Sequence, residues 1–238
     1  MGKKAYYILL LGLLFFIGGA LTGCFNSKTI KTDYGIFKLQ KIFIEDSTLN
    51  LKSQSVLSLD ILNFYIQTKG LTKKLTIEEE KSVQDSISKE FQKFLKNNFK
   101  CIKSNQREII LGENYKNFYN IIITRRSKLE DNFSLSDKDK EILKEFYKKY
   151  KVRYIILPIE ITIKRNQIDQ IGDKKIFVIE ESLYIQIWDM KKGDLVFENI
   201  SNIRFKNTYT DKKSEFYDIT KKVFPTLVKN IFSSINIK

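Results

Sequence analysis

Alternating apolar and polar positions are clearest in the second half of the chain. Odd-numbered residues are apolar from Ile155 to Ile163 and, with Glu181 as the exception, from Phe177 to Ile187. A period of two is typical of strands that bury one face. Gly193 can supply the left-handed conformation that a tight hairpin turn requires. We therefore predict a three-strand antiparallel meander over residues 153–165, 175–190 and 195–205.

The same pattern makes predictions about the connections and the packing of the meander. The polar stretch 166–174 predicts a loop between the first two strands. Pro158 has no N–H to donate, which indicates an edge strand or a β-bulge. Because the odd faces of the strands are mostly apolar, we expect Leu157, Ile185 and Phe197 to lie together against the last helix.

Apolar residues recur at helical spacing in three other segments. Thr76 and Glu79 form a capping box at the start of the first. Ser136 and Asp139 mark the start of the second, and Pro225 predicts a kink in the third. The predicted helices cover about residues 76–98, 136–150 and 214–235.

The remaining segments are less clearly patterned. Residues 56–67 fit strand alternation and a short helix about equally, and we favour the strand. The other predicted strands are 36–45, 99–103 and, within the poorly patterned stretch Ser104 to Asn132, Glu108–Leu111 and Tyr119–Thr124. We expect an α/β (α+β) fold, with two or three amphipathic helices packed on a mixed sheet that contains the meander. Residues 36–238 are predicted to form a single domain.

The start of the chain has the features of an export signal. Lys3 and Lys4 precede an apolar run from Ala5 to Ala20, which ends on Leu21-Thr22-Gly23-Cys24. A basic segment, a short apolar segment and small residues at the cleavage point are typical of a signal peptide. This stretch resembles a bacterial lipoprotein signal with its lipobox. The resemblance implies cleavage after residue 23 and acylation of Cys24; an uncleaved membrane anchor is the alternative.

The predicted anchor changes how the charge of the chain is interpreted. The formal net charge is +14, and removal of Lys3 and Lys4 with the signal peptide lowers it to +12. Lysine far outnumbers arginine, whereas proteins that recognise bases favour the arginine fork. Residues 24–35 would form a short tether to the lipid. We therefore expect a basic surface beside anionic lipid headgroups and no nucleic-acid partner.

Composition argues against several kinds of chemistry. The chain has no histidine, which removes Ser-His-Asp and Cys-His nucleophiles and every metal site that contains histidine. Neither G-x-x-x-x-G-K-[ST] nor G-x-G-x-x-G occurs. With Cys24 acylated, Cys101 has no cysteine partner, and we interpret it as a small buried hydrophobe. We expect no enzymatic activity, no cofactor and no metal ligands.

Four candidate sites also have simpler structural explanations. Glu160 and Glu180 would lie opposite each other if the 166–174 loop centres near Gln170, and paired carboxylates carry out glycoside hydrolysis. We favour an exposed sheet face neutralised by lysines, and a bulge that turns Glu181 outward. The S-x-x-K match from Ser86 to Lys89 is interpreted as part of a solvated helix surface. The aromatic strip Tyr115, Phe118 and Tyr119 is interpreted as part of the core.

Two stretches resemble a known periplasmic domain. Residues 147–157 (Tyr-Lys-Lys-Tyr-Lys-Val-Arg-Tyr-Ile-Ile-Leu) pass from a helix into a strand, and residues 185–198 form a hairpin with the pattern Asp189-x-x-x-Gly193. Both are similar to the α/β domain shared by the TolB amino-terminal domain and the curli-secretion lipoproteins. The overall layout also resembles lipopolysaccharide-assembly lipoproteins of the LptE type, although the helix at Ser136 departs from that pattern. Neither resemblance implies catalytic residues.

These features together predict an envelope lipoprotein that binds proteins or assists assembly. Its expected partners are membrane lipid through acylated Cys24 and other envelope proteins, and a homo-oligomer is compatible with the sequence. The outer membrane is favoured over the inner one, with the domain in the periplasm or at the surface. The alternative is a carrier of lipid or lipopolysaccharide, and a glycan-cleaving enzyme is the least favoured.

Overall fold

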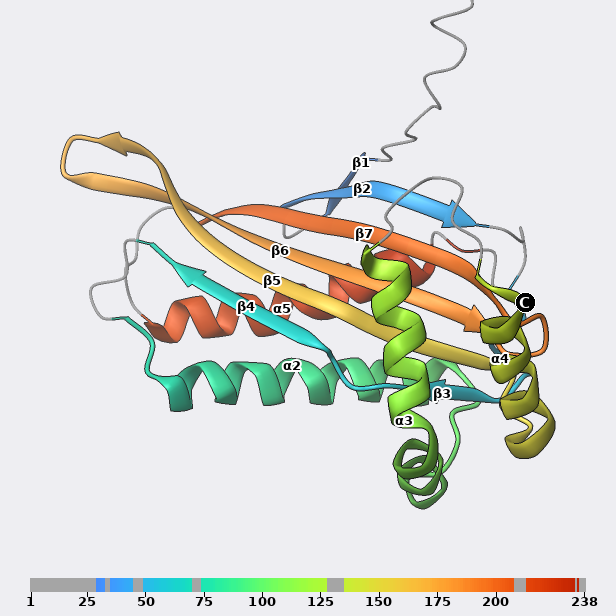
Figure 1. The fold of residues 1–238 in the computed structure, drawn as a ribbon. Helices are drawn as coiled ribbons and strands as arrows, with labels where there is room; N and C mark the ends of the chain where they lie inside the picture. The colour runs from blue at the N-terminus through green and yellow to red at the C-terminus, as the bar shows by residue number, and fades with distance from the viewer. Residues whose placement is uncertain are drawn as a thin grey trace, which may run out of the picture.

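A mixed sheet forms the centre of the protein (Figure 1). The computed structural model describes residues 29–32, 35–44, 49–69, 74–127, 135–207, 213–233 and 235. Within them the sheet has seven strands in the order β1-β2-β7-β6-β5, and β3 and β4 both pair with the outer edge of β5. The strands are β1 (Thr29–Thr32), β2 (Gly35–Ile44), β3 (Val56–Ser58), β4 (Asn63–Thr68), β5 (Tyr154–Ile171), β6 (Lys174–Asp189) and β7 (Asp194–Asn207).

Helices cover both faces of the sheet. Within the described residues they are α2 (Ile77–Asn98), α3 (Ser104–Ser127), α4 (Asp137–Tyr150) and α5 (Lys213–Ser233). Apolar residues of α2 and α5 share one core cluster with one sheet face, and those of α3 and α4 share a second cluster with the other. The α/β (α+β) fold class is confirmed, with four described helices where two or three were expected.

Local signals placed α2 and α4 correctly. The Thr76 hydroxyl accepts from the Glu79 amide at 3.2 Å, and the Glu79 carboxylate accepts from the Thr76 amide at 2.7 Å. The Ser136 hydroxyl accepts from the Asp139 amide at 3.2 Å. These bonds satisfy N–H groups that the first helical turn leaves without partners. Pro225 lies inside α5, as expected.

The meander is confirmed, but its first hairpin is longer than predicted. β5 and β6 stay paired as far as Ile171 and Lys174, so the turn consists of Gly172 and Asp173. Gly172 adopts a φ of 60°, in the left-handed region. The outer part of this hairpin is largely exposed, so its strands can be polar on both faces and resemble a loop in sequence.

A β-bulge in β5 exchanges the two faces of that strand. The register with β6 shifts between Pro158 and Glu160. Before the shift, Leu157 packs with the α3–α4 cluster; after it, Ile161 and Ile163 pack with the α2–α5 cluster. The bulge expected at Pro158 is therefore present, whereas the edge position is wrong because β3 and β4 flank this stretch of β5. The prediction that Leu157 lies with Ile185 and Phe197 is also wrong.

The segment after α2 differs from the expectation. Residues 104–127 form α3, not two short strands, and residues 99–103 contribute only a single bridge between Val56 and Cys101. Among the described side chains of α3, Ile110, Phe118 and Ile121 are buried, whereas Ile109 is 60% and Tyr119 42% exposed. Because apolar side chains of α3 are found among its exposed residues as well as its buried ones, the amphipathic pattern is weak, which explains why the sequence did not indicate a helix.

The N-terminal part of the sheet changes the predicted tether. β2 confirms the strand expected at 36–45, and 56–67 contains two strands, β3 and β4, both parallel to β5. Thr29–Thr32 forms β1 and pairs with β2, so this part of the tether predicted for 24–35 belongs to the sheet. The signal peptide and Cys24 lie outside the described residues.

Candidate functional site

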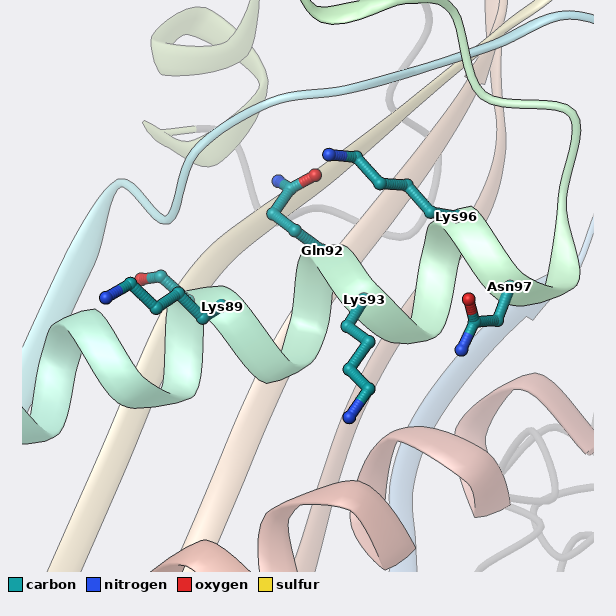
Figure 2. A pocket seen from close by; sticks show the side chains of 6 residues that line it. Lys89, Gln92, Lys93, Lys96 and Asn97 are labelled. Carbon is teal, nitrogen blue, oxygen red and sulfur yellow. The ribbon is translucent and has the colours of Figure 1, made fainter.

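A shallow basic depression lies on the exposed surface of α2. It encloses about 390 Å³ and is lined by Ser88, Lys89, Gln92, Lys93, Lys96 and Asn97. Figure 2 shows that Gln92 and Lys96 project from one side of the helix, while Lys93 and Asn97 project from the other, toward α5. Every lining side chain can donate a hydrogen bond and none is a carboxylate, so the depression suits anionic oxygen atoms.

The surrounding sequence reinforces this positive charge. Residues 86–107 contain six basic residues and a single acidic one, Glu90. Lys100 and Lys103 continue the exposed lysines beyond the end of α2. Arg107 is paired with Asp60 at 2.6 Å, but Lys89, Lys93 and Lys96 form no ion pair within the described part of the chain. The excess positive charge on this surface therefore faces solvent.

Gln92 fixes the position of this helix against the sheet. Its amide nitrogen donates to the Ser58 hydroxyl at 3.0 Å and lies 3.4 Å from the Leu59 carbonyl oxygen. Val83, Ile87, Phe91 and Leu95 of the same helix are buried against the sheet. The lysines consequently project from a helix that is anchored by both apolar packing and a polar contact.

The carboxylate pair considered for catalysis is not formed. Glu160 lies opposite Tyr184, whereas Glu180 lies between Lys164 on β5 and Arg204 on β7. Four residues along the strand separate the two glutamates, about 13 Å, compared with the 5–9.5 Å between carboxyl groups of glycosidases. The predicted register was wrong because the hairpin turn lies at Gly172 and Asp173, and because β5 has a second register shift, between Gln167 and Asp169.

Glu181 is buried, contrary to the outward orientation that we expected. Its side chain is 0% exposed and faces the α2–α5 side of the sheet, directly between Ile163 and Ile203. Neither carboxylate oxygen has a hydrogen-bond partner in the described structure. Burial raises the pKa of Glu181 well above its usual value, and the nearby Thr220 hydroxyl lowers this pKa only in part.

The other sequence candidates match the roles that we favoured only in part, since Phe118 belongs to the core and Tyr119 does not. Ser86 is half-buried and Lys89 exposed on α2, and Phe118 belongs to the core while Tyr119 is 42% exposed. The side chain of Tyr115 lies outside the described part. Cys101 is a free, partly buried thiol packed against the α2–α5 cluster, and burial raises its pKa.

A buried ladder of polar side chains on β6 and β7 was not predicted from the sequence. The Trp188 indole N–H donates to Gln186 Oε1 at 3.1 Å, and Gln186 Nε2 donates to Glu198 Oε1 at 2.8 Å and to the Tyr184 hydroxyl at 3.0 Å. Tyr184 in turn donates to Glu198. The signal was present, since Tyr184, Gln186 and Trp188 alternate on one face. Because its members bond to one another, we interpret the ladder as a structural element.

The Asp-x-x-x-Gly pattern has a structural explanation. The Asp189 carboxylate accepts from the amides of Lys191 and Lys192, and pairs with Arg153 at 2.6 Å. The Gly193 amide donates to the Asp189 carbonyl oxygen at 2.8 Å. Gly193 has a φ of 73°, and a Cβ there would lie 2.6 Å from the Lys140 carbonyl oxygen. Both residues therefore serve the turn between β6 and β7.

The sheet face beside α3 is polar where no helix covers it. Both α3 and α4 lie toward one end of this face (Figure 1). At the other end, Tyr65, Thr162, Ser182 and Asn202 form one row across four strands. Such a row suits contact with water or a polar partner and does not suit acyl chains.

The described residues contain neither a candidate metal centre nor a candidate membrane-spanning helix. No group of three or more His, Cys, Asp or Glu side chains there is arranged to hold a metal ion. None of the described helices is long and apolar enough to span a bilayer.

No protein-family model matches the chain, and no curated protein matches its sequence. Solved structures that match the chain include bacterial lipoproteins. The minor lipoprotein from Acinetobacter baumannii is 11% identical, with 78% of this chain and 92% of that chain covered and a TM-score of 0.37. Lipoprotein GNA1162 from Neisseria meningitidis is 10% identical, with 74% and 99% covered and a TM-score of 0.32. The hypothetical protein CT253 from Chlamydia trachomatis is 10% identical, with 75% and 95% covered and a TM-score of 0.38. Similarity at this level does not indicate a shared function.

Proposed function

We propose that the protein is a lipoprotein of the bacterial envelope, anchored through Cys24, which acts by binding partners and not by catalysis. The observation that carries the proposal is the distance along the chain between anchor and fold. β1 begins at Thr29, five residues after the lipobox cysteine. Five residues reach at most about 17 Å, so acylated Cys24 would hold the sheet beside the bilayer.

Binding is favoured over turnover by the chemistry of the polar groups. Glu160 and Glu180 are far apart, and Glu180 has cationic neighbours on both sides. The polar ladder around Gln186 bonds to itself inside the core. The lipid-carrier alternative requires an apolar surface for acyl chains, and the uncovered part of the sheet is polar.

Lipidation can be tested with two matched substitutions, because the chain has only two cysteines. Palmitate labelling of the full chain in a bacterial host should be abolished by Cys24→Ala, with loss of signal cleavage. Cys101→Ala is the control and should label normally. Labelling and processing that persist in Cys24→Ala would refute the anchoring.

Partner binding can be tested by crosslinking in cells. Lys144 on α4 and Lys192 in the β6–β7 turn are suitable attachment points, and discrete protein bands are expected. Capture of lipopolysaccharide alone would favour the carrier. If Glu160→Gln and Glu180→Gln each abolished function while folding and crosslinking persisted, the enzyme alternative would be supported.

A further inference from the structure

The lysines on the two sides of the sheet differ in how they are paired. Three of the five lysines on α4, Lys140, Lys144 and Lys149, form ion pairs with Asp194, Glu141 and Glu113, at 3.3, 2.9 and 2.7 Å. On α2 and α5, seven exposed lysines form no ion pair within the described part of the chain: Lys81, Lys89, Lys93, Lys96, Lys221, Lys222 and Lys229. Uncompensated positive charge is therefore concentrated on the α2–α5 side.

These lysines belong to one continuous layer. α2 and α5 lie side by side behind the sheet (Figure 1) and contact each other through Phe94 and Phe232, whose ring centroids are 5.4 Å apart. The exposed acidic side chains described on the two helices, Glu78, Glu80, Asp85 and Asp218, all lie in the first halves of these helices. The positive excess therefore extends from the middle of each helix toward its C-terminal end.

The reach of the tether allows this layer to lie on the membrane. α5 packs beneath β6, β7 and β2, and β2 is the neighbour of β1 at the anchored edge. The outer surface of a helix layer lies about 15 Å from the plane of the sheet that it covers. The five residue steps from Cys24 to Thr29 span about 17 Å when extended. The anchor and the outer surface of α2 and α5 can thus reach the same bilayer.

We propose that the outer surface of α2 and α5 docks on the anionic phosphate headgroups of the membrane that holds the lipid anchor. The face with α3, α4 and the polar sheet then points away from the bilayer. This proposal rests on the anchoring through Cys24 and adds the orientation of the domain. Lysines act as flexible point charges, which suits a fluid surface of phosphates. An acidic protein surface is the competing occupant.

Chemical footprinting of lysines can test the orientation. The full lipidated protein is reconstituted into phosphatidylcholine vesicles with and without phosphatidylglycerol, acetylated briefly and analysed by mass spectrometry. Lys89, Lys93, Lys96 and Lys229 should be labelled more slowly on the anionic vesicles, and high salt should remove this protection. Lys138 and Lys148, exposed on α4, should be labelled equally on both.

A triple variant provides a second readout. Lys89→Gln, Lys93→Gln and Lys96→Gln together should reduce the docked population relative to the undocked one by up to about a hundredfold, seen as loss of protection at Lys229. The control variant Lys138→Gln, Lys148→Gln and Lys164→Gln should retain it. Equal labelling on both vesicles, or protection of α4 instead, would overturn the proposal. Protection seen only in native envelopes would also overturn it, in favour of an acidic protein partner. Failure of the anchoring is distinguishable, because an unacylated protein would not enter the vesicles.

Discussion

Glu181 lies directly opposite Ile163 in the ladder between β5 and β6, and both side chains are completely buried. Ile203 flanks Glu181 on the other side, and it is also completely buried. An acid therefore occupies a position where both cross-strand neighbours are aliphatic. The Thr220 hydroxyl of α5, which partly offsets the raised pKa of Glu181, is itself buried without a hydrogen-bond partner in the described structure. This arrangement is expected to lower the stability of the fold.

Glu181→Met should stabilise the protein. The substitution keeps the length of the side chain and removes a buried polar group without a partner, so we expect the free energy of unfolding to rise by about 1–3 kcal/mol at pH 5. Denaturant unfolding of the full chain in detergent micelles measures the change. Glu180→Met, on the polar face of the same strand, is the control and should bring no gain. Destabilisation by Glu181→Met would mean that this carboxyl has a stabilising partner.

The advantage of Glu181→Met should grow with pH. The folded-state pKa of Glu181 is raised above its unfolded value, because burial disfavours the charged form. The contribution of Glu181 to the free energy of unfolding of the wild type is therefore fully present below about pH 4.5. It is lost as the pH rises toward the folded-state pKa. Over that range the gap between variant and wild type should widen by about 1.4 kcal/mol per pH unit. The pKa values of Glu113 and Glu141 are lowered by hydrogen bonds from Lys149 and Lys144, and these contributions cancel in the difference. A gap that is constant from pH 4.5 to 8 would contradict the burial of an ionisable Glu181.

Two glycines with similar backbone conformations should respond differently to alanine. Gly193→Ala combines a left-handed φ with a Cβ 2.6 Å from the Lys140 carbonyl oxygen, and should cost at least about 2 kcal/mol. Gly172→Ala has the same type of φ but no atom within 4 Å of its Cβ, so about 1 kcal/mol is expected. Thermal unfolding of both variants gives the comparison. Equal losses would show that the contact between the β6–β7 turn and α4 does not constrain Gly193.

A charge at Ile185 should disrupt the α2–α5 core. Ile185 is fully buried and lies opposite Asn199 on β7, in the cluster that includes Phe197 and α5. Ile185→Asp should therefore cost about 4 kcal/mol or more, because the carboxylate would lose its hydration. Ser182→Asp, on the opposite polar face of β6, should cost less than about 1 kcal/mol. An unchanged melting temperature for Ile185→Asp would refute the assignment of faces.

Local signals predicted the elements whose geometry depends on neighbours in sequence. The capping residues Thr76 and Ser136 define the starts of α2 and α4, because the bonds that they form close within one helical turn. Gly193 marks the second hairpin for the same reason, since its φ is a property of the turn itself. Strict alternation identified the strands of the meander wherever one face is buried and the other is not.

The candidate site could be predicted only in part from the sequence. The excess of lysine and the absence of histidine were visible in the sequence, and they directed attention to anionic surfaces. The sequence could not reveal that three of the five lysines on α4 are paired while the exposed lysines described on α2 and α5 are not. Pairing depends on which carboxylates other elements bring near, as Asp194 of β7 does for Lys140.

Composition and periodicity alone determined the α/β class, two capped helices and the three-strand meander, because each depends on contacts that repeat along a single segment. Tertiary packing decided the helical state of residues 104–127, the exchange of faces at the Pro158 bulge and the burial of Glu181. Each of these depends on a distant element. The helix α3 packs in the core cluster that it shares with α4, and the bulge at Pro158 lies beside the break between β3 and β4. Glu181 is buried beneath α5. A one-residue shift in register reverses every later side chain of a strand. The pair Glu160 and Glu180 is absent for a related reason: the turn at Gly172 and Asp173, with a second register shift between Gln167 and Asp169, places Lys164 opposite Glu180.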